Sequence, residues 1–244
     1  MRTVAIVEAR MRSSRLPGKV LRPILGRPML QHLVERLRRA RTLDGIVVAT
    51  TADSSDDPVE ALTSALGVGL FRGSEEDVLG RVLEAAHRAP ADVIVEVTGD
   101  CPLVDPALVD QLVVLYRTGG YDYVSNVLER TYPRGMDVQV FATTALEAAD
   151  RATGDPVHRE HVSLYIYEHP ETFRLHNVRS GLPAAQADLR LTVDTAEDLA
   201  LVTAIFEALQ PSRPGFSLSD ILALLERRPE LAALNRGVAQ KPVR

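Results

Sequence analysis

The stretch EARMRSSRLPGK, residues 8–19, follows the apolar run Val4–Val7 and precedes an amphipathic pattern near residues 28–41. It holds four cations, and no acidic residue follows Glu8 within it. Open α/β sheets bind ligands where their strands end, and Arg and Lys side chains at such a place suit phosphate groups. The stretch therefore predicts a first strand that leads into a polyphosphate-binding loop. The alternative is an ordinary solvated basic loop, since most charge runs lie on the surface.

Two familiar phosphate-binding loops are absent from this stretch. Neither G-x-x-x-x-G-K-[ST] nor G-x-G-x-x-G occurs, because Gly18 is the only glycine before Lys19. The sequence therefore disfavours a P-loop kinase and a dinucleotide-dependent oxidoreductase. Zinc is not expected either, because His158 and His161 do not match the spacings H-E-x-x-H or H-x-x-E-H.

The composition is that of an ordinary globular chain. With 244 residues, 45% of them hydrophobic and 25% charged, the chain can bury a full core and suits one α/β domain with appendages. The net charge of −5 disfavours nucleic acid as a partner. The single cysteine, Cys101, excludes an intramolecular disulfide, and no apolar run approaches the length of a membrane span. We therefore expect a cytoplasmic protein with no membrane partner.

Strand-like and helical patterns alternate through the first half of the chain. The strand-like runs are Val4–Val7, Ile46–Ala49, Gly69–Phe71 and Val93–Val97. The helical patterns lie near residues 28–41, 57–67, 75–88 and 106–118. This alternation is typical of βαβ units. It predicts an α/β, Rossmann-like, three-layer fold with a mostly parallel central sheet.

The alternation changes after Gly119-Gly120. Extended runs near 121–124 and 138–141 are followed by a helical pattern near 157–168 and a strand-like run near 173–178. We interpret residues 121–168 as a small excursion that serves as a lid or a dimer interface.

The last third of the chain is predicted to be mainly helical. A strand over Arg190–Val193 leads to a helix near 196–208, and apolar helical spacing continues over 217–236. We expect one domain over residues 1–210, C-terminal helices packed on it over 211–236, and a loose tail over 237–244.

Two aspartates follow predicted strands. Asp100 comes after the run Val93–Val97 and the turn Thr98-Gly99, and Asp194 comes directly after Arg190–Val193. If both strands are parallel and central, these carboxylates converge at one edge of the sheet, facing the basic loop. Taken singly, Asp100 could instead be a turn or cap residue and Asp194 a helix N-cap. Together with the loop they form the constellation expected of a functional site.

The loop resembles the R-x-x-S-x-R-L-P-G-K signature of nucleotidylyltransferases, matched here by residues 10–19. The resemblance is to the cytidylyltransferases that make CMP-activated acidic sugars, such as those for acylneuraminate and 3-deoxy-manno-octulosonate. It is strongest to the spore-coat polysaccharide biosynthesis protein F group. It runs from Thr3 to about Ala208 and reappears in Phe71–Ser74, Thr98–Leu103, Tyr132–Asp137, Arg159–Val162 and Leu191–Thr195.

The resemblance implies a nucleotide-diphospho-sugar transferase type of fold and a homodimer. It implies that CMP passes from CTP to an oxygen of a small acidic acceptor, with release of pyrophosphate, and that Asp100 and Asp194 bind Mg²⁺. The alternatives are a glycosyltransferase, a transferase that uses another nucleoside triphosphate, and a catalytically silent nucleotide-binding relative. A glycosyltransferase usually needs a D-x-D motif, which this chain lacks.

The candidate site residues fall into three groups. The catalytic group consists of Lys19, Arg10, Asp100 and Asp194, with Lys19 stabilising the transition state at the α-phosphate and Arg10 holding the departing phosphates. The nucleotide-binding group consists of Ala9, Arg10, Arg15, Lys19, Arg72, Thr98 and Gly99. The acceptor-binding group consists of Asn126, Arg134, Asp137, Glu160 and His161. Arg72 resembles a residue that reads the pyrimidine in relatives, but it could equally be an exposed residue paired with Glu75 or Glu76.

The chain departs from the sialic-acid and ketodeoxyoctonate synthetases at Cys101 and in the segment Tyr132–Asp137, which matches the spore-coat group instead. Glu8 also differs, since relatives often carry an uncharged residue there. Cys101 follows Asp100, and we expect it to be a small apolar filler rather than a nucleophile, because a neighbouring carboxylate raises a thiol pKa. Glu8 places a negative charge beside the phosphate loop, and the sequence offers no account of it. The acceptor therefore stays open among a nonulosonic acid, a phosphonate and other oxygen nucleophiles.

Overall fold

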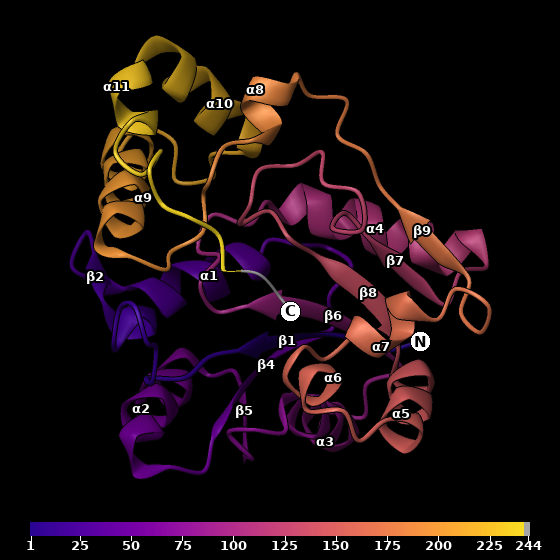
Figure 1. Cartoon of the computed structure of the whole chain (residues 1–244). Helices are drawn as coiled ribbons and strands as arrows, with labels where there is room; N and C mark the ends of the chain where they lie inside the picture. Colours follow the sequence, from indigo (N-terminus) through magenta and orange to yellow (C-terminus); the bar gives the residue numbers. More distant parts are fainter. Residues whose placement is uncertain (242–244) are drawn as a thin grey trace.

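The computed structural model describes residues 1–241, and in them a seven-stranded sheet lies between two layers of helices (Figure 1). The strand order is β5-β4-β1-β6-β8-β7-β9. All neighbouring strands pair in parallel except β8, which is antiparallel to both β6 and β7. The strands are β1 Thr3–Glu8, β4 Gly45–Thr51, β5 Gly69–Gly73, β6 Val93–Thr98, β7 Tyr123–Ser125, β8 Gln139–Ala142 and β9 Leu175–Asn177. The α/β three-layer expectation is confirmed.

The helices divide between the two faces of the sheet. One face carries α1 Met29–Leu37, α2 Asp57–Leu66, α4 Pro106–Gly119, α9 Ala196–Leu209, α10 Leu218–Arg227 and α11 Pro229–Ala232. The other carries α3 Val78–Arg88, α5 Thr143–Ala152 and α7 Leu164–Glu168. The remaining elements are the short helices η1 Lys19–Leu21, η2 Ser54–Asp56, α6 Pro156–Glu160 and α8 Ala184–Ala187, and the two-stranded ribbon of β2 Pro23–Ile24 with β3 Arg27–Pro28.

The apolar side chains of β1 contribute to the hydrophobic cores on both faces of the sheet. Successive side chains on a strand point to opposite faces. Ala5 and Val7 accordingly pack with α1 and α4, while Val4 and Ile6 pack with α3. Because helices cover both faces, side chains on both faces are buried, which is why the central strands are mostly continuous rather than alternating hydrophobic runs.

The strand order creates a switch point beside β1. From β1 the chain moves outward through β4 to β5, then returns through α3 to form β6 on the opposite side of β1. The loops after β1 and β6, which lead to α1 and α4, lie side by side at the carboxyl ends of these two neighbouring strands, where open α/β sheets bind ligands.

Two predicted elements differ from the structure, and helix α5 has no predicted counterpart. Residues 190–193 form no strand: Arg190 makes only an isolated bridge with Arg134, and Val193 runs beside the loop after β6. The predicted helix near 157–168 is two short helices, α6 and α7, with a break between them.

Residues 121–168 supply β7 and β8 to the central sheet, so much of the predicted excursion is part of the main sheet. Its role as a lid or dimer interface stays a prediction. Residues 242–244 of the predicted loose tail lie outside the described residues. Within residues 1–241, no helix combines the length and hydrophobicity that a membrane crossing requires.

Candidate active site

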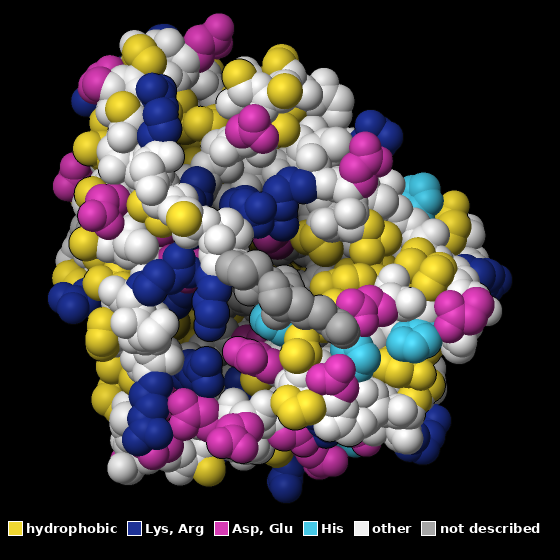
Figure 2. All heavy atoms as spheres, in the orientation of Figure 1, with side chains coloured by type: hydrophobic (Ala, Val, Ile, Leu, Met, Phe, Trp, Pro, Cys, Tyr) yellow, Lys and Arg dark blue, Asp and Glu magenta, His cyan; other side chains and the backbone are white. Residues whose placement is uncertain are grey.

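A cleft of about 550 Å³ opens at the carboxyl ends of β1 and β6. Figure 2 shows Lys and Arg side chains gathered along the middle of this face, with acidic side chains beside them. Most of the predicted site residues line this cleft: Ala9, Arg10, Arg15, Lys19, Thr98, Gly99, Asp100, Arg134, Asp137, Glu160, His161 and Asp194. The structure thus brings together residues that are far apart in the sequence.

The basic loop is closed on itself and tied to the next strand. Gly18 N donates to Met11 O at 2.8 Å, and Met11 N donates to Asp56 Oδ1 at 2.7 Å. Asp56 is almost fully buried and also accepts hydrogen bonds from Thr50 and Thr51 at the end of β4. These bonds lower the pKa of Asp56 against the opposing effect of burial. Asp56 therefore fixes the loop, a role that the sequence did not reveal.

Lys19 lies between the two predicted metal-binding aspartates. Its Nζ is 2.8 Å from Asp100 Oδ2 and 2.8 Å from Asp194 Oδ1. Burial alone would lower the pKa of Lys19, but the two carboxylates outweigh it and raise the pKa. Lys19 is therefore an ammonium at neutral pH and cannot serve as a general base.

Asp194 is surrounded by cations. Besides Lys19, it pairs with Arg15 Nη2 at 2.9 Å and with Arg190 Nη2 at 2.5 Å, both through Oδ2. Burial would raise the pKa of Asp194, but these cations lower it. Arg190 is itself buried and held by the fully buried Asp198. Arg190 was missed as a site residue; its one signal in the sequence is a charge within an otherwise apolar run.

Backbone hydrogen bonding brings Asp100 and Asp194 together, although the segment before Asp194 is not a strand of the sheet. Val193 N donates to Asp100 O at 2.9 Å, so the segment before Asp194 lies directly beside the turn after β6. That turn also lies close to the end of β1: a Cβ on Gly99 would come within 2.7 Å of Glu8 O, so only glycine fits there.

Neither aspartate serves as a helix cap. Thr195 is the N-cap of α9, in a capping box with Asp198, and Asp105 is the N-cap of α4. The cap alternatives for Asp100 and Asp194 are therefore wrong, and both carboxylates face the cleft.

The other loop arginines are held by acidic residues at the rim of the cleft. Arg10 Nη1 is 3.5 Å from Glu75 Oε1, and Arg12 pairs with Glu75 at 3.1 Å and Asp53 at 2.8 Å. These pairs are largely exposed, so they contribute little stability and can open to receive an anionic ligand.

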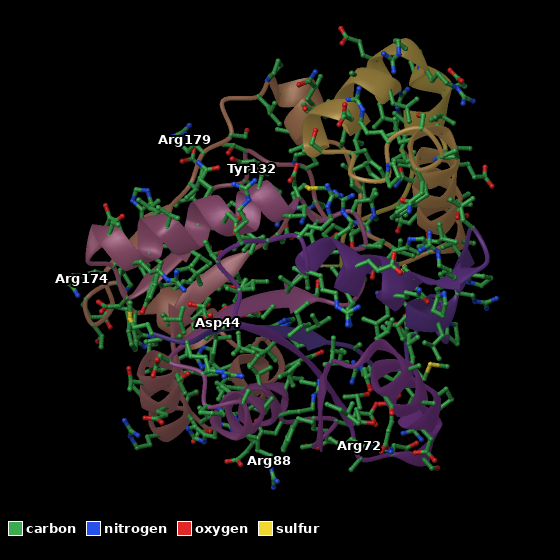
Figure 3. The ribbon with its side chains drawn as sticks, turned by 180° about the vertical axis from the view of Figure 1, so that it is seen from behind. Asp44, Arg72, Arg88, Tyr132, Arg174 and Arg179 are labelled. Atoms are coloured by element: carbon green, nitrogen blue, oxygen red, sulfur yellow. The ribbon has the colours of Figure 1, made fainter. Side chains whose placement is uncertain are left out.

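Two predicted binding residues lie outside the cleft lining. Arg72 is held by Asp57 at 2.8 Å and Glu60 at 2.5 Å on α2, at the side of the molecule (Figure 3). Its partners are thus not the Glu75 or Glu76 that the sequence suggested. Asn126 is fully buried and spans a turn by bonding Met136 O and Val138 N, which is a structural role. The structure does not bring either residue to the others.

The other predicted acceptor residues line the part of the cleft next to β8, α6 and α7. Asp137 is paired with Arg130 at 2.7 and 3.1 Å. Within residues 1–241 the Arg134 side chain has no hydrogen bond or ion pair, although it lines the cleft. Burial lowers the pKa of His161, which makes this side chain neutral at physiological pH.

Glu8 and Glu96 form a second carboxyl pair in the cleft wall. Their carboxyl groups lie within hydrogen-bonding reach of each other, and Glu8 Oε1 and Glu96 Oε2 are buried without any other partner in the described residues. Burial raises the pKa of Glu8 to about 7 despite the attraction of Arg81, and it raises the pKa of Glu96 as well. A proton held between the two carboxyls supplies the missing donor.

Cys101 is buried next to Asp100. Burial and the Asp100 charge raise the pKa of the Cys101 thiol, so it resists forming the thiolate that a nucleophile requires.

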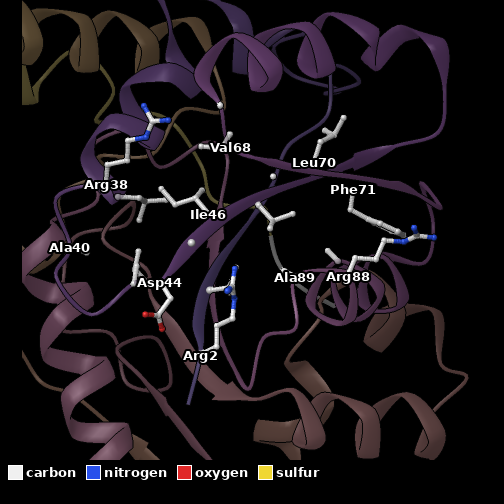
Figure 4. A pocket seen from close by; sticks show the side chains of 18 residues that line it. Arg2, Arg38, Ala40, Asp44, Ile46, Val68, Leu70, Phe71, Arg88 and Ala89 are labelled. Atoms are coloured by element: carbon white, nitrogen blue, oxygen red, sulfur yellow. The ribbon is translucent and has the colours of Figure 1, made fainter.

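A second hollow of about 510 Å³ lies at the opposite, amino-terminal ends of β1, β4 and β5 (Figure 4). Apolar side chains line it together with Arg2, Arg38 and Arg88. Arg88 lies over the Phe71 ring at 5.7 Å, and Arg38 bonds Leu66 O. None of the predicted site residues lines this hollow.

Known proteins resemble this chain over most of its length. A family model described as cytidylyltransferase matches residues 4–239. The spore coat polysaccharide biosynthesis protein SpsF of Bacillus subtilis is 36% identical over 93% of this chain and 95% of that protein. A 3-deoxy-manno-octulosonate cytidylyltransferase of Geobacter metallireducens is 33% identical over 68% of this chain and 75% of that protein. The solved structure of a cytidylyltransferase from Leptospira borgpetersenii has a TM-score of 0.90 at 33% identity, covering 98% of this chain and 100% of that one.

These similarities confirm the resemblance that the motifs suggested. The matched region includes the basic loop, both aspartates and most of the cleft lining. On its sequence and its fold alike, this chain belongs to the cytidylyltransferase family.

Proposed function

We propose that this cytidylyltransferase moves CMP from CTP to an oxygen of a small acidic sugar or related acceptor, in a Mg²⁺-dependent reaction that releases pyrophosphate. The observation that carries the proposal is the position of Lys19, between Asp100 and Asp194 at the switch point of the sheet. Nucleotidyl transfer needs cations for the phosphates and carboxylates for a metal at one place. This cleft provides both.

The donor set fits Mg²⁺. The candidate ligands Asp100 and Asp194 offer only oxygen atoms, and both carboxylates meet at a single cation, Lys19 Nζ. Within residues 1–241 there is no cluster of three or more metal-ligating side chains, so the protein offers no complete metal cage. This suits Mg²⁺, which commonly takes one or two carboxylates and completes its shell with phosphate oxygens and water. When bound, the metal would neutralise phosphate charge and orient the α-phosphate.

The remaining chemistry belongs to the side chains of the basic loop. Lys19 stays protonated, so it can turn from the carboxylates toward an α-phosphate oxygen and stabilise charge that grows in the transition state. Arg10 and Arg15 are placed to hold the departing phosphates through bidentate contacts. The acceptor oxygen attacks the α-phosphorus in line, the bond to the bridging oxygen breaks, and pyrophosphate leaves.

An acidic acceptor is supported by the one unpaired guanidinium near β8. Arg134 lines the cleft without an ion pair in the described residues, and a carboxylate or phosphonate would satisfy it. Sugar acids fit this requirement, and one relative is named a 3-deoxy-manno-octulosonate cytidylyltransferase. We also propose a homodimer that uses residues 121–168, which light scattering of the purified protein tests, and we retain the expectation of a cytoplasmic location.

Pyrophosphate release tests this proposal. The protein is supplied with Mg²⁺ and, in turn, CTP, UTP, ATP, GTP and dTTP, against a panel of keto-sugar acids, sugar phosphates and phosphonates. We expect release with CTP and an acidic acceptor and its loss when EDTA removes Mg²⁺. Release with another nucleotide alone, or equal release in EDTA, would show the proposal to be wrong.

A further inference from the structure

The last two described residues, Gln240 and Lys241, line the cleft. Asn235 is buried and anchors the chain before them, because Nδ2 donates to Arg190 O at 2.9 Å and to Asp198 Oδ1 at 2.8 Å. The residues that follow, Gly237–Lys241, are called here the C-terminal segment. Its last two residues line the cleft, although the sequence predicted a loose tail for this region.

The C-terminal segment is bonded to two arginines that hold Asp194. Arg15 Nη1 donates to Ala239 O at 3.3 Å, and Arg190 Nη1 donates to Gln240 Oε1 at 2.5 Å. Both arginines also pair with Asp194 Oδ2. The segment therefore borders the phosphate side of the cleft, where the basic loop lies.

Lys241 is an unpaired cation in the cleft wall. The loop cations Arg10, Arg12, Arg15 and Lys19 all pair with carboxylates. Lys241 has no such pair within residues 1–241, while its charge is close enough to act with burial in lowering the pKa of His161. A nucleoside triphosphate brings several negative charges to a cleft in which the loop cations are already paired, so a free ammonium near the loop can neutralise part of that charge.

The positions of the lysines also indicate a role for Lys241 in this cleft. Lys19 and Lys241 are the only lysines in the sequence, and both line this cleft. Every other fixed cationic side chain is an arginine. Lysine is a mobile point charge with a compact ammonium, which suits a phosphate that binds and then leaves.

We propose that the C-terminal segment forms a wall of the nucleotide site and that Lys241 binds the β- and γ-phosphates, which leave as pyrophosphate. The assignment rests on the proposed function, because it requires a bound triphosphate. It extends the site past residue 239, where the match to the family model ends.

Nucleotides of different length test the assignment. Isothermal titration with Mg²⁺ compares CTP, CDP and CMP on the wild type, on Lys241→Met and on Lys241→Arg, which keeps the charge. Loss of one charged phosphate contact should weaken CTP binding to Lys241→Met by about tenfold. CMP should change by less than about twofold, and Lys241→Arg should retain most of the CTP affinity. Arg236→Met, which removes a nearby exposed cation outside the cleft, should leave all three affinities unchanged.

Lysine labelling gives a second measurement on the unmodified chain. With two lysines, acylation at each can be followed by mass spectrometry. We expect CTP with Mg²⁺ to protect Lys241, and CMP with Mg²⁺ to leave it open to acylation.

The failures of the two proposals are distinguishable. If the wild type binds no CTP, both are wrong. If the wild type binds CTP but Lys241→Met binds it equally well, or loses CMP and CTP affinity in equal measure, only the Lys241 assignment is wrong. If Lys241→Met changes only the KM of the acceptor, Lys241 contacts the acceptor rather than the nucleotide. The assignment of Lys241 to the β- and γ-phosphates is then wrong.

Discussion

The cleft contains two pairs of carboxyl groups that differ in their neighbours. Asp100 and Asp194 share the Lys19 ammonium at 2.8 Å, and the cations around Asp194 lower its pKa against burial. Glu8 and Glu96 share no cation; burial dominates and raises the pKa of both. The cations around Asp194 favour its ionised form, whereas burial favours a proton on the glutamate pair. The comparison teaches that the neighbouring charges, rather than the residue type, decide what a buried carboxyl can do.

The raised pKa of Glu8 also explains how a glutamate can lie beside a loop that is proposed to bind phosphate. An ionised carboxylate at the end of β1 would repel the phosphates that the loop is proposed to bind. A protonated Glu8–Glu96 pair carries less negative charge, so it weakens that repulsion.

The largest expected effect comes from breaking the aspartate pair. Asp100→Asn removes one of the two proposed metal ligands, and we expect pyrophosphate release to fall by about 10³-fold while the protein stays folded. The steady-state assay and a circular dichroism melt measure both quantities. Asp188→Asn, an exposed aspartate outside the cleft, is the control. Normal Mg²⁺-dependent turnover in Asp100→Asn would show that Asp100 is not needed to bind the metal. The aspartate pair would then have no function that sets it apart from the glutamate pair.

A smaller effect is expected from removing the cation that distinguishes the pairs. Lys19→Met leaves Asp100 and Asp194 facing each other without their shared ammonium. Turnover should fall by about 10²-fold, because one preorganised donor to the transition state is lost. CTP affinity should fall less, since Arg10 and Arg15 remain. Equal losses in turnover and affinity would instead make Lys19 a ground-state binding residue.

The smallest effect concerns stability and the glutamate pair. The pKa of Glu8 is raised from 4.5 to about 7, so its protonated form favours the folded state. That contribution is fully present below pH 4.5 and is lost as pH rises through 7. Glu8→Gln, which mimics the protonated form, should therefore be more stable than the wild type by about 3 kcal/mol at pH 8 and nearly equal to it at pH 4.

Urea unfolding at the two pH values measures this difference. Glu76→Gln, an exposed glutamate outside the cleft, should show no such pH-dependent gain. A Glu8→Gln protein that is less stable at pH 8 would mean that Glu8 is ionised in the fold, and the contrast between the pairs would disappear.

Much of the site was predictable because its residues follow strands. The order of apolar runs and helical patterns placed Lys19 and Asp100 at the same sheet edge, and the structure brings them to one ion pair. Asp194 reaches the same place by another route, since the predicted strand before it is only an extended segment beside the loop after β6. Asp56 and Lys241 could not be identified in this way, because Asp56 holds the basic loop through Met11, far from it in the sequence, and Lys241 lines the cleft from beyond the last helix. Arg190 lies close to Asp194 in the sequence, but its burial against Asp198 depends on the fold.

The sequence by itself determined the α/β architecture, the basic loop and the family, since these depend on periodicity and on short motifs that local chemistry enforces. Only the tertiary structure decided that the pKa of Glu8 is raised and that of Asp194 lowered, that Arg72 and Asn126 lie outside the cleft lining, and that Gln240 and Lys241 line the cleft. The physical reason is that burial and charge–charge distances are properties of the packed fold. The pKa and the contacts of a side chain depend on the residues around it in space. The sequence determines those neighbours only once the whole chain has folded.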